Sequence, residues 1–157
     1  MATEYELAVS ADAACVSAEL LLPGVRPERA LAAFTEPDLV RDWWAAELTA
    51  QLVPGGEYLA RFPALGQTMI GVVEEYLPGR LLAFTWGWSH QLEAAGRYGV
   101  TVSAASAGRG QGPGARLDLV HAPRAGVRVP AGDPAPGEHR EGWEHFLPRL
   151  AAALTAR

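Results

Sequence analysis

Turn-forming residues recur at short intervals between residues 45 and 122 and divide this region into strand-length pieces. The turn markers are Pro54-Gly55-Gly56, Pro63 to Gly66, Pro78-Gly79 and the glycine-rich segment 108–114. The pieces between them are rich in the β-branched and aromatic residues that favour strands: AELTAQLV, GEYLARF, QTMIGVVEEYL, RLLAFTWGW, RYGVTVSA and ARLDLVH. Because no helical segment separates these pieces, the pattern predicts consecutive antiparallel hairpins rather than alternating parallel strands and helices.

The segments before this β region predict one strand and two short helices. The stretch 14–22 reads as a strand that stops at Pro23-Gly24, and 26–44 as two helices. Pro27 suits a first helical turn, and Thr35 suits the N-cap of the second helix. Residues 1–13 are predicted to be a flexible leader, with an extension of the sheet edge as the alternative for 1–12. Residues 14–157 are predicted to form a single domain.

The C-terminal segment EGWEHFLPRLAAAL predicts a long helix with one apolar face. Trp143, Phe146, Leu147 and Leu150 follow the spacing of three and four residues that places side chains on one side. Pro148 is expected to let the helix bend along a curved sheet. We therefore predict an α+β fold, a six- to seven-stranded antiparallel sheet curled around this helix. The layout leaves room for a pocket near the ends of the helix and under the two short helices.

Composition and charge argue against several classes of partner. Hydrophobic residues make up 49% of the 157 residues, enough for a sizeable core. A net charge of −5, with scattered arginines and no lysine, gives no support for nucleic-acid binding. No apolar run is long enough for membrane insertion, and no signal peptide is recognisable. With Cys15 as the only cysteine, a reducing, cytoplasmic location is expected, whereas the oligomeric state is not indicated.

The stretch PERALAAFTEPDLVRDWW resembles the opening signature of the SRPBCC, or START-like, superfamily. The nearest branch contains homologues of the activator of the ninety-kilodalton heat-shock protein's ATPase. Further matches are VPGGEY, GVVEEYLPGRLLAFTW, ARLDLVH and EGWEHFLPRL, so the resemblance covers roughly residues 14–157. It implies a helix-grip fold with a hydrophobic cavity. The sequence departs from the family at Leu31, where tryptophan is frequent, and in the loop 122–137, which rims the pocket in the family.

Strand alternation directs one histidine toward the predicted cavity. In ARLDLVH, Leu117, Leu119 and His121 share one face, whereas Arg116 and Asp118 lie on the other. An inward histidine can serve as an acid, a base or a hydrogen-bond donor near neutral pH, which makes His121 the candidate catalytic residue. The alternative is a core histidine hydrogen-bonded to a neighbouring polar group, and this is the more frequent situation.

Aromatic residues on the strand faces and on the last helix predict a ligand-binding wall. Such walls suit a flat, apolar molecule, although packing in the core is the alternative for any single aromatic residue. Five tryptophans in 157 residues favour the cavity. His139 is expected near the mouth of the pocket. The full set of predicted ligand-binding residues is Trp43, Tyr58, Phe62, Met69, Phe84, Trp86, Trp88, Tyr98, Leu119, His121, His139, Trp143, Phe146 and Leu147.

Other polar groups carry weaker signals. If Met69 and Val73 face inward in QTMIGVVEEYL, Glu75 does too, but a solvated strand end for Glu74 and Glu75 is the preferred reading. Glu138, His139, Glu141 and His145 start the last helix without the convergent ligands that zinc needs, so no metal is expected. The segment GRGQGPG precedes a strand and is read as a hairpin turn, not a phosphate loop.

Three functions remain open on the sequence. The aromatic strand faces favour a cofactor-free protein that binds a small hydrophobic or aromatic molecule. The alternative is an enzyme, such as a polyketide-type cyclase or dehydratase, in which His121 is the acid or base and Tyr58, Tyr98 or Glu75 assist. The third possibility is a co-chaperone-like or ligand-sequestering self-resistance protein, and it rests on the breadth of the family alone.

Overall fold

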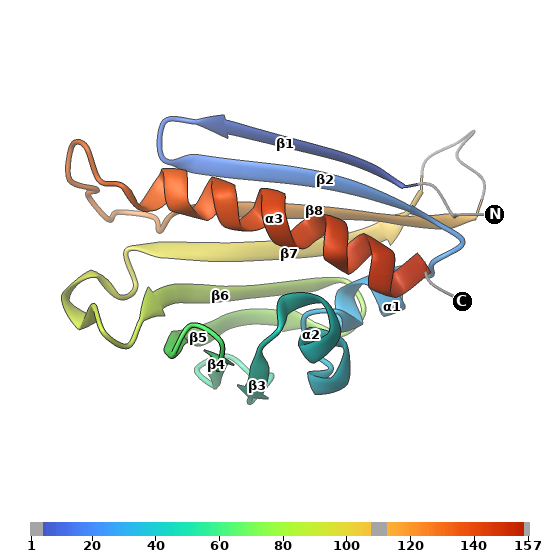
Figure 1. Cartoon of the computed structure of the whole chain (residues 1–157), viewed down its shortest axis with the longest axis horizontal. Coiled ribbons are helices and arrows are strands. Elements are labelled where there is room, and N and C mark those ends of the chain that lie inside the picture. Colours follow the sequence, from blue (N-terminus) through green and yellow to red (C-terminus); the bar gives the residue numbers. More distant parts are fainter. Residues whose placement is uncertain (1–4, 108–112, 156–157) are drawn as a thin grey trace.

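The computed structural model describes residues 5–107 and 113–155 and contains one curved antiparallel sheet and three α-helices (Figure 1). The strand order is β1-β2-β8-β7-β6-β5-β4-β3. Two strands and two short helices come first: β1 (Glu6–Asp12), β2 (Cys15–Pro23), α1 (Pro27–Ala32) and α2 (Pro37–Trp44). The rest of the sheet and the long helix follow: β3 (Glu47–Ala50), β4 (Glu57–Phe62), β5 (Gln67–Leu77), β6 (Leu81–Trp88), β7 (Tyr98–Ser106), β8 (Gly114–Pro123) and α3 (Ala135–Thr155).

The sheet has one strand more than the predicted six to seven because the N-terminal residues pair with β2. The register runs from Glu6 opposite Leu21 to Asp12 opposite Cys15. Residues 6–12 therefore extend the edge of the sheet. This is the alternative that the sequence analysis gave to a flexible leader. Leu7 and Val9 on β1 pack against the core, which explains why this short and otherwise polar segment is held in place.

Two buried hydrogen bonds join helices α1 and α2 to each other and to strand β4 of the sheet. The indole Nε1 of Trp43 donates to the Ala33 carbonyl at 2.7 Å, and the Tyr58 hydroxyl donates to the Phe34 carbonyl at 2.6 Å. These bonds satisfy carbonyl groups at the end of α1 that would otherwise be buried without a partner. The N-cap of α2 is Glu36, not the predicted Thr35, because Pro37 itself occupies the first helical position.

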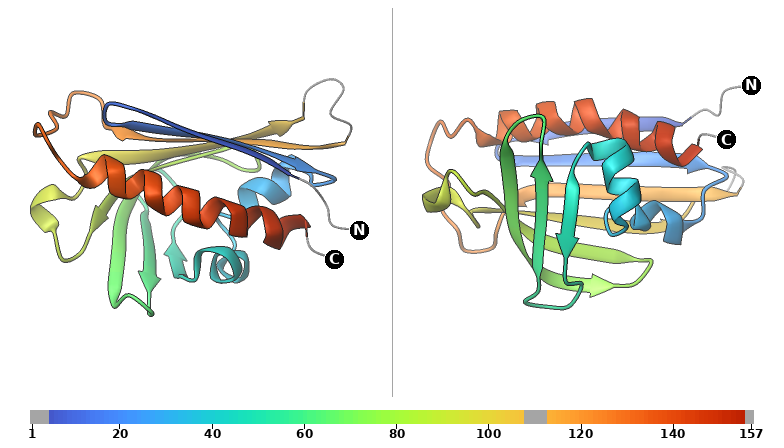
Figure 2. Two further views of the ribbon diagram at one scale, coloured as in Figure 1. Left: turned by 45° about the horizontal axis from the view of Figure 1, so that its top comes forward. Right: turned by 60° about the horizontal axis from the view of Figure 1, so that its bottom comes forward.

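Helix α3 lies in the concave side of the sheet, as Figure 2 shows from two directions. It packs against α2, β2 and β1, and it continues through Pro148 without interruption. Its buried face carries Trp143, Leu147 and Leu150, which meet the inward residues of the strands. Among the described residues, no helix has both the length and the hydropathy needed to cross a membrane.

The strand alternation places side chains as predicted along β6 and β8 but is interrupted in β5. Leu117, Leu119 and His121 are all buried on β8. In β5 the register shifts between Val73 and Glu75, so Glu74 and Glu75 both face solvent. Strands β7 and β8 pair antiparallel on either side of the glycine-rich segment, but residues 108–112 of the predicted turn lie outside the described residues.

Candidate functional site

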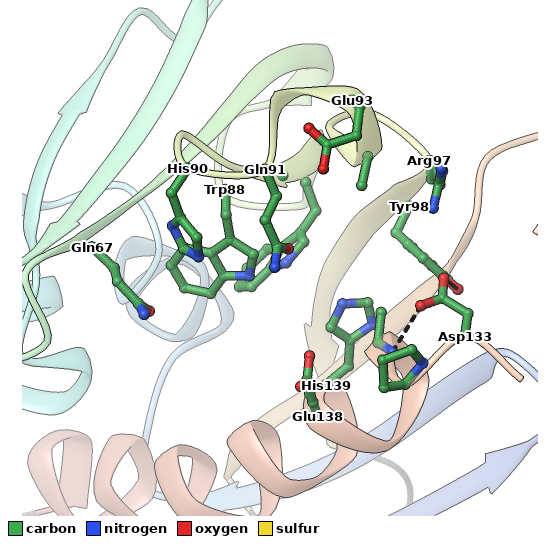
Figure 3. Close-up of a pocket in the computed structure, with 15 residues that line it drawn as sticks. Gln67, Trp88, His90, Gln91, Glu93, Arg97, Tyr98, Asp133, Glu138 and His139 are labelled. Atoms are coloured by element: carbon green, nitrogen blue, oxygen red, sulfur yellow. Dashed lines mark hydrogen bonds between the residues drawn. The ribbon is translucent and has the colours of Figure 1, made fainter.

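A pocket of about 600 Å³ opens at the end of the sheet where α3 begins (Figure 3). We call it the end pocket. Its walls come from the end of β6, the connection to β7, the loop before α3 and the first turns of α3. The residues that line it are Gln67, Trp86, Gly87, Trp88, His90, Gln91, Glu93, Ala94, Arg97, Tyr98, Asp133, Pro134, Ala135, Glu138 and His139.

The connection between β6 and β7 forms one wall by folding tightly back on the strand. It contains a short 3-10 turn, η1 (Leu92–Ala94), and the amide of Gly96 donates to the Trp86 carbonyl at 3.0 Å. A Cβ at Gly87 would lie 2.6 Å from the Cα of Ala95, so only glycine permits this approach. The wall is therefore held by its backbone, and its side chains are displayed toward the pocket.

Asp133 fixes the opposite wall. One carboxylate oxygen accepts a hydrogen bond from the Tyr98 hydroxyl at 2.9 Å, and the other accepts one from the backbone amide of Ala135 at 3.1 Å. This residue thus links β7 to the start of α3. Burial, followed by the hydrogen bond and the negative charge of Asp133, raises the pKa of Tyr98 to about 12, so its hydroxyl remains a donor at neutral pH.

Two histidines form the inner end of the pocket. The ring of His139, which lines the pocket, stacks on that of His121 with a centroid distance of 3.6 Å and an interplanar angle of 15°. His121 lies behind it with no exposed surface, and its Nδ1 accepts a hydrogen bond from Trp143 Nε1 at 3.0 Å. The histidine predicted to face inward does so, but in this arrangement His139 separates it from the pocket.

Burial keeps both rings neutral. It lowers the pKa of His139 to about 4, although the negative charge of Asp133 opposes this shift. Burial also lowers the pKa of His121 well below its ordinary value, and the neighbouring His139 contributes in the same direction. Each ring therefore offers one N–H donor and one acceptor nitrogen at neutral pH.

Four of the predicted ligand-binding residues line the end pocket: Trp86, Trp88, Tyr98 and His139. The others lie elsewhere because the concave face is filled by aromatic packing, as in the stacked pair Tyr58 and Phe84 with a centroid distance of 4.1 Å. Phe146 is half-buried on α3. The residues that pack into the core behind the pocket are Trp43, Tyr58, Phe62, Met69, Phe84, Leu119, His121, Trp143 and Leu147.

Sequence reasoning missed the polar part of the lining. Gln91, Glu93 and Arg97 lie in the β6–β7 connection, where no periodicity indicates the direction of a side chain. Asp133 carried a usable signal, since an aspartate followed by proline just before a helix is typical of a helix start. Within residues 5–107 and 113–155, no group of three or more histidine, cysteine or acidic side chains is arranged to hold a metal ion.

A curved antiparallel sheet that grips a long C-terminal helix, with a pocket where the helix begins, defines a helix-grip protein. The chain belongs to the family described as Activator of Hsp90 ATPase homolog 1-like protein, within the SRPBCC superfamily, because the model of that family matches residues 25–155. The resemblance seen in the sequence is thereby confirmed.

Solved structures share this fold at low sequence identity. Protein MLL2253 from Mesorhizobium loti is 23% identical with a TM-score of 0.71, over 89% of this chain and 96% of that one. The Aha1 dimer from Colwellia psychrerythraea is 16% identical with a TM-score of 0.71, over 90% and 96%. DynU16, a protein of the dynemicin biosynthetic locus, is 19% identical with a TM-score of 0.71, over 92% of this chain but 48% of DynU16. No curated protein matches the chain.

Proposed function

We propose that this protein binds a small, flat organic molecule in the end pocket, with the aromatic face of the molecule against Trp86 and Trp88. The observation that carries the proposal is a pocket of about 600 Å³ with two tryptophan side chains in its wall. Their rings meet edge to face with a centroid distance of 5.7 Å, so they form two sides of a corner. Pockets of roughly 300–1,000 Å³ with aromatic walls are typical of small-molecule sites.

The two tryptophans would contact such a molecule in different ways. Trp86 is nearly buried and fixed by its contacts with Trp44 and Trp143, whereas Trp88 is half-buried at the rim. A flat ligand would cover the remaining exposed surface of Trp88 and gain stacking as well as burial of apolar area. The glutamines Gln67 and Gln91 supply polar contacts that would orient the bound molecule.

Ligand binding is better supported than a catalytic role for His121. A general acid or base must come within hydrogen-bond reach of the reacting group, and His121 is fully buried behind His139. The DynU16 neighbour belongs to the dynemicin biosynthetic locus, which is in keeping with a small-molecule ligand. The enzyme and co-chaperone alternatives therefore stand behind ligand binding.

The proposal is tested by titrating the protein with fatty acids, sterols and polycyclic aromatic compounds while following tryptophan fluorescence. We expect saturable quenching by the flat aromatics, because Trp86 and Trp88 would touch them. Trp88→Ala should weaken binding about tenfold, since it removes one stacking wall. Leu65→Ala changes a side chain that is 60% exposed and does not line the pocket, and it should leave affinity unchanged. A flat response across the panel would contradict the proposal.

A further inference from the structure

Buried polar atoms without a partner gather at one place in this molecule. Among the described residues, four buried side-chain nitrogens lack a hydrogen-bond partner: Trp86 Nε1, His121 Nε2, Arg124 Nε and His139 Nδ1. Three of these belong to rings in mutual contact. The ring of Trp86 lies 4.7 Å from that of His121 and 5.9 Å from that of His139, measured between centroids. We call these three rings the nitrogen cluster.

Native proteins leave few buried polar groups without a partner, so three at the inner end of one pocket are unusual. Arg124, the fourth residue of this kind, differs because its guanidinium already binds Glu74 and the Gly96 carbonyl through other nitrogens. Side-chain packing alone does not explain why several unpaired nitrogens lie beside a pocket. A polar group that enters from the pocket would satisfy them.

Hydrogen-bond chemistry shows which kind of group is missing. The indole nitrogen of Trp86 is a donor only. His121 Nδ1 accepts from Trp143, so the neutral ring carries its proton on Nε2, which makes that atom a second donor. At least two N–H groups of the nitrogen cluster therefore lack an acceptor. Their missing partner is an acceptor atom with free lone pairs, for which an oxygen is the commonest choice.

Charge decides between a neutral and an ionised oxygen. The pocket lining contains the carboxylates of Glu93, Asp133 and Glu138 against one guanidinium, that of Arg97. Figure 3 shows Glu93 and Glu138 on opposite sides of the pocket. An anion would have to pass between these carboxylates and would then be buried beside two neutral histidines, which is unfavourable. An uncharged carbonyl oxygen meets neither obstacle.

We propose that the ligand of the end pocket is a flat aromatic compound with a ring carbonyl, and that the carbonyl oxygen accepts hydrogen bonds from the nitrogen cluster. The rings of Trp86 and His139 line the pocket, but their unpaired nitrogens are buried, so the oxygen reaches these atoms and His121 Nε2 when the His139 ring turns aside. Side-chain rotations of this size are common on binding. This inference rests on the proposed function, because it names the chemical class of the molecule in the same pocket.

The test compares two ligands that differ in a single group. Fluorenone and fluorene are flat tricyclic compounds of similar size, and only fluorenone has a carbonyl. Equilibrium dialysis of each against the wild-type chain gives the two dissociation constants. We expect fluorenone to bind about two- to tenfold more tightly for each hydrogen bond that its oxygen accepts. We also expect its carbonyl stretching band to move to lower wavenumber when bound.

Two tryptophan variants locate the oxygen. Trp86→Phe keeps an aromatic wall but removes the Nε1 donor, so the preference for fluorenone should fall toward one and the carbonyl band should move back. Trp88→Phe changes the same residue type in the same pocket, but Trp88 Nε1 is not one of the unpaired buried nitrogens. The preference should survive there. His139→Phe provides a second change within the nitrogen cluster, should Trp86→Phe not fold.

The outcomes separate the two proposals. Binding of neither compound would contradict the proposed function itself. Equal binding of both would leave the pocket as a ligand site and overturn the inference about the carbonyl. A preference for fluorenone that persists in both Trp86→Phe and His139→Phe would also overturn it, because the oxygen would then lie away from the nitrogen cluster.

Discussion

Two neutral histidines stacked inside a protein make the stability of its fold sensitive to acid. His139 and His121 are buried side by side, and neither contacts a carboxylate that would compensate a positive charge at the distance of a salt bridge among the described residues. In the unfolded chain each imidazole takes up a proton near its ordinary pKa of 6.5. The folded chain delays this uptake, because burial lowers the pKa of His139 to about 4 and lowers that of His121 well below its ordinary value.

The chain should therefore lose stability as the pH falls from 7 to 5. Over this range the unfolded state binds more protons than the folded state, so its free energy drops relative to the folded state. The contribution of His139 above pH 6.5 is fully present, and about 2 kcal/mol of it is lost by pH 5. Urea unfolding at several pH values measures the slope.

His139→Phe should make this slope shallower, because the substituted ring cannot take up a proton in either state and only the contribution of His121 remains. His145→Phe changes an exposed histidine on the same helix and should keep the wild-type slope. An unchanged slope in His139→Phe would show that His139 binds protons equally in the folded and unfolded chains between pH 5 and 7, and that burial does not lower its pKa.

At the scale of elements, the start of α3 depends on one side chain. Asp133 accepts hydrogen bonds from Tyr98 on β7 and from the Ala135 amide at the first residue of α3. Since the last helix is separated from β8 by a long loop, this carboxylate determines where the helix begins relative to the sheet.

Asp133→Ala should lower the free energy of unfolding by about 1–2 kcal/mol, because it leaves a tyrosine hydroxyl and a helix-start amide without their acceptor. Amides in the first turn of α3 should exchange with solvent faster, as measured by hydrogen exchange. The pKa of Tyr98 should fall from about 12 toward its ordinary value without reaching it, since burial remains. Asp12→Ala removes an exposed carboxylate on β1 and should change none of these quantities. Unaltered exchange in Asp133→Ala would disprove the anchoring role.

The elements also show how far the sequence could be interpreted. Alternation along β8 and β6 correctly predicted that Leu119, His121 and Trp86 face inward, because strands of an antiparallel sheet with one buried face follow a period of two. The bulge between Val73 and Glu75 has no comparable signal, so alternation alone could not assign a face to Glu75. The solvated strand end that the sequence analysis preferred for Glu75 is confirmed.

The pocket itself was predictable only in outline. A cavity near the ends of the helix was expected, with Tyr58, Phe84 and Trp143 in its walls, but these three side chains are packed in the core. The space that remains lies at the end, where irregular backbone between β6 and β7 and before α3 directs the side chains. Such backbone depends on tertiary contacts, for example that of Gly87 with Ala95, which no local pattern reveals.

At the scale of the whole molecule, β1 closes one edge of the sheet. It pairs along the length of β2, and Leu7 and Val9 contribute to the core beneath α3. An unpaired edge strand offers free backbone groups to other chains. Strand β1 is mostly exposed and has a carboxylate at each end, so it is a less favourable edge for pairing with another chain than β2, whose residues alternate between half-buried and buried.

Removal of residues 1–12 should therefore lower stability and promote self-association, because β2 becomes the edge. Light scattering across a range of protein concentrations would detect the association. The double variant Leu7→Ser and Val9→Ser loses the same apolar contacts but keeps the backbone pairing, so it should be less stable yet remain as dispersed as the full chain. Similar association in the truncated chain and the double variant would argue against the edge explanation.

The tryptophans have a spectroscopic consequence of their own. Trp43 stacks on Trp44 at 4.9 Å, and Trp44 continues to Trp86 at 6.2 Å and to Trp143 at 5.7 Å, while Trp86 reaches Trp88 at 5.7 Å. At such separations excitation energy passes between indoles faster than it is emitted. The five indoles therefore share their excitation energy. A molecule that contacts only Trp88, the outermost indole, can quench the fluorescence of all five.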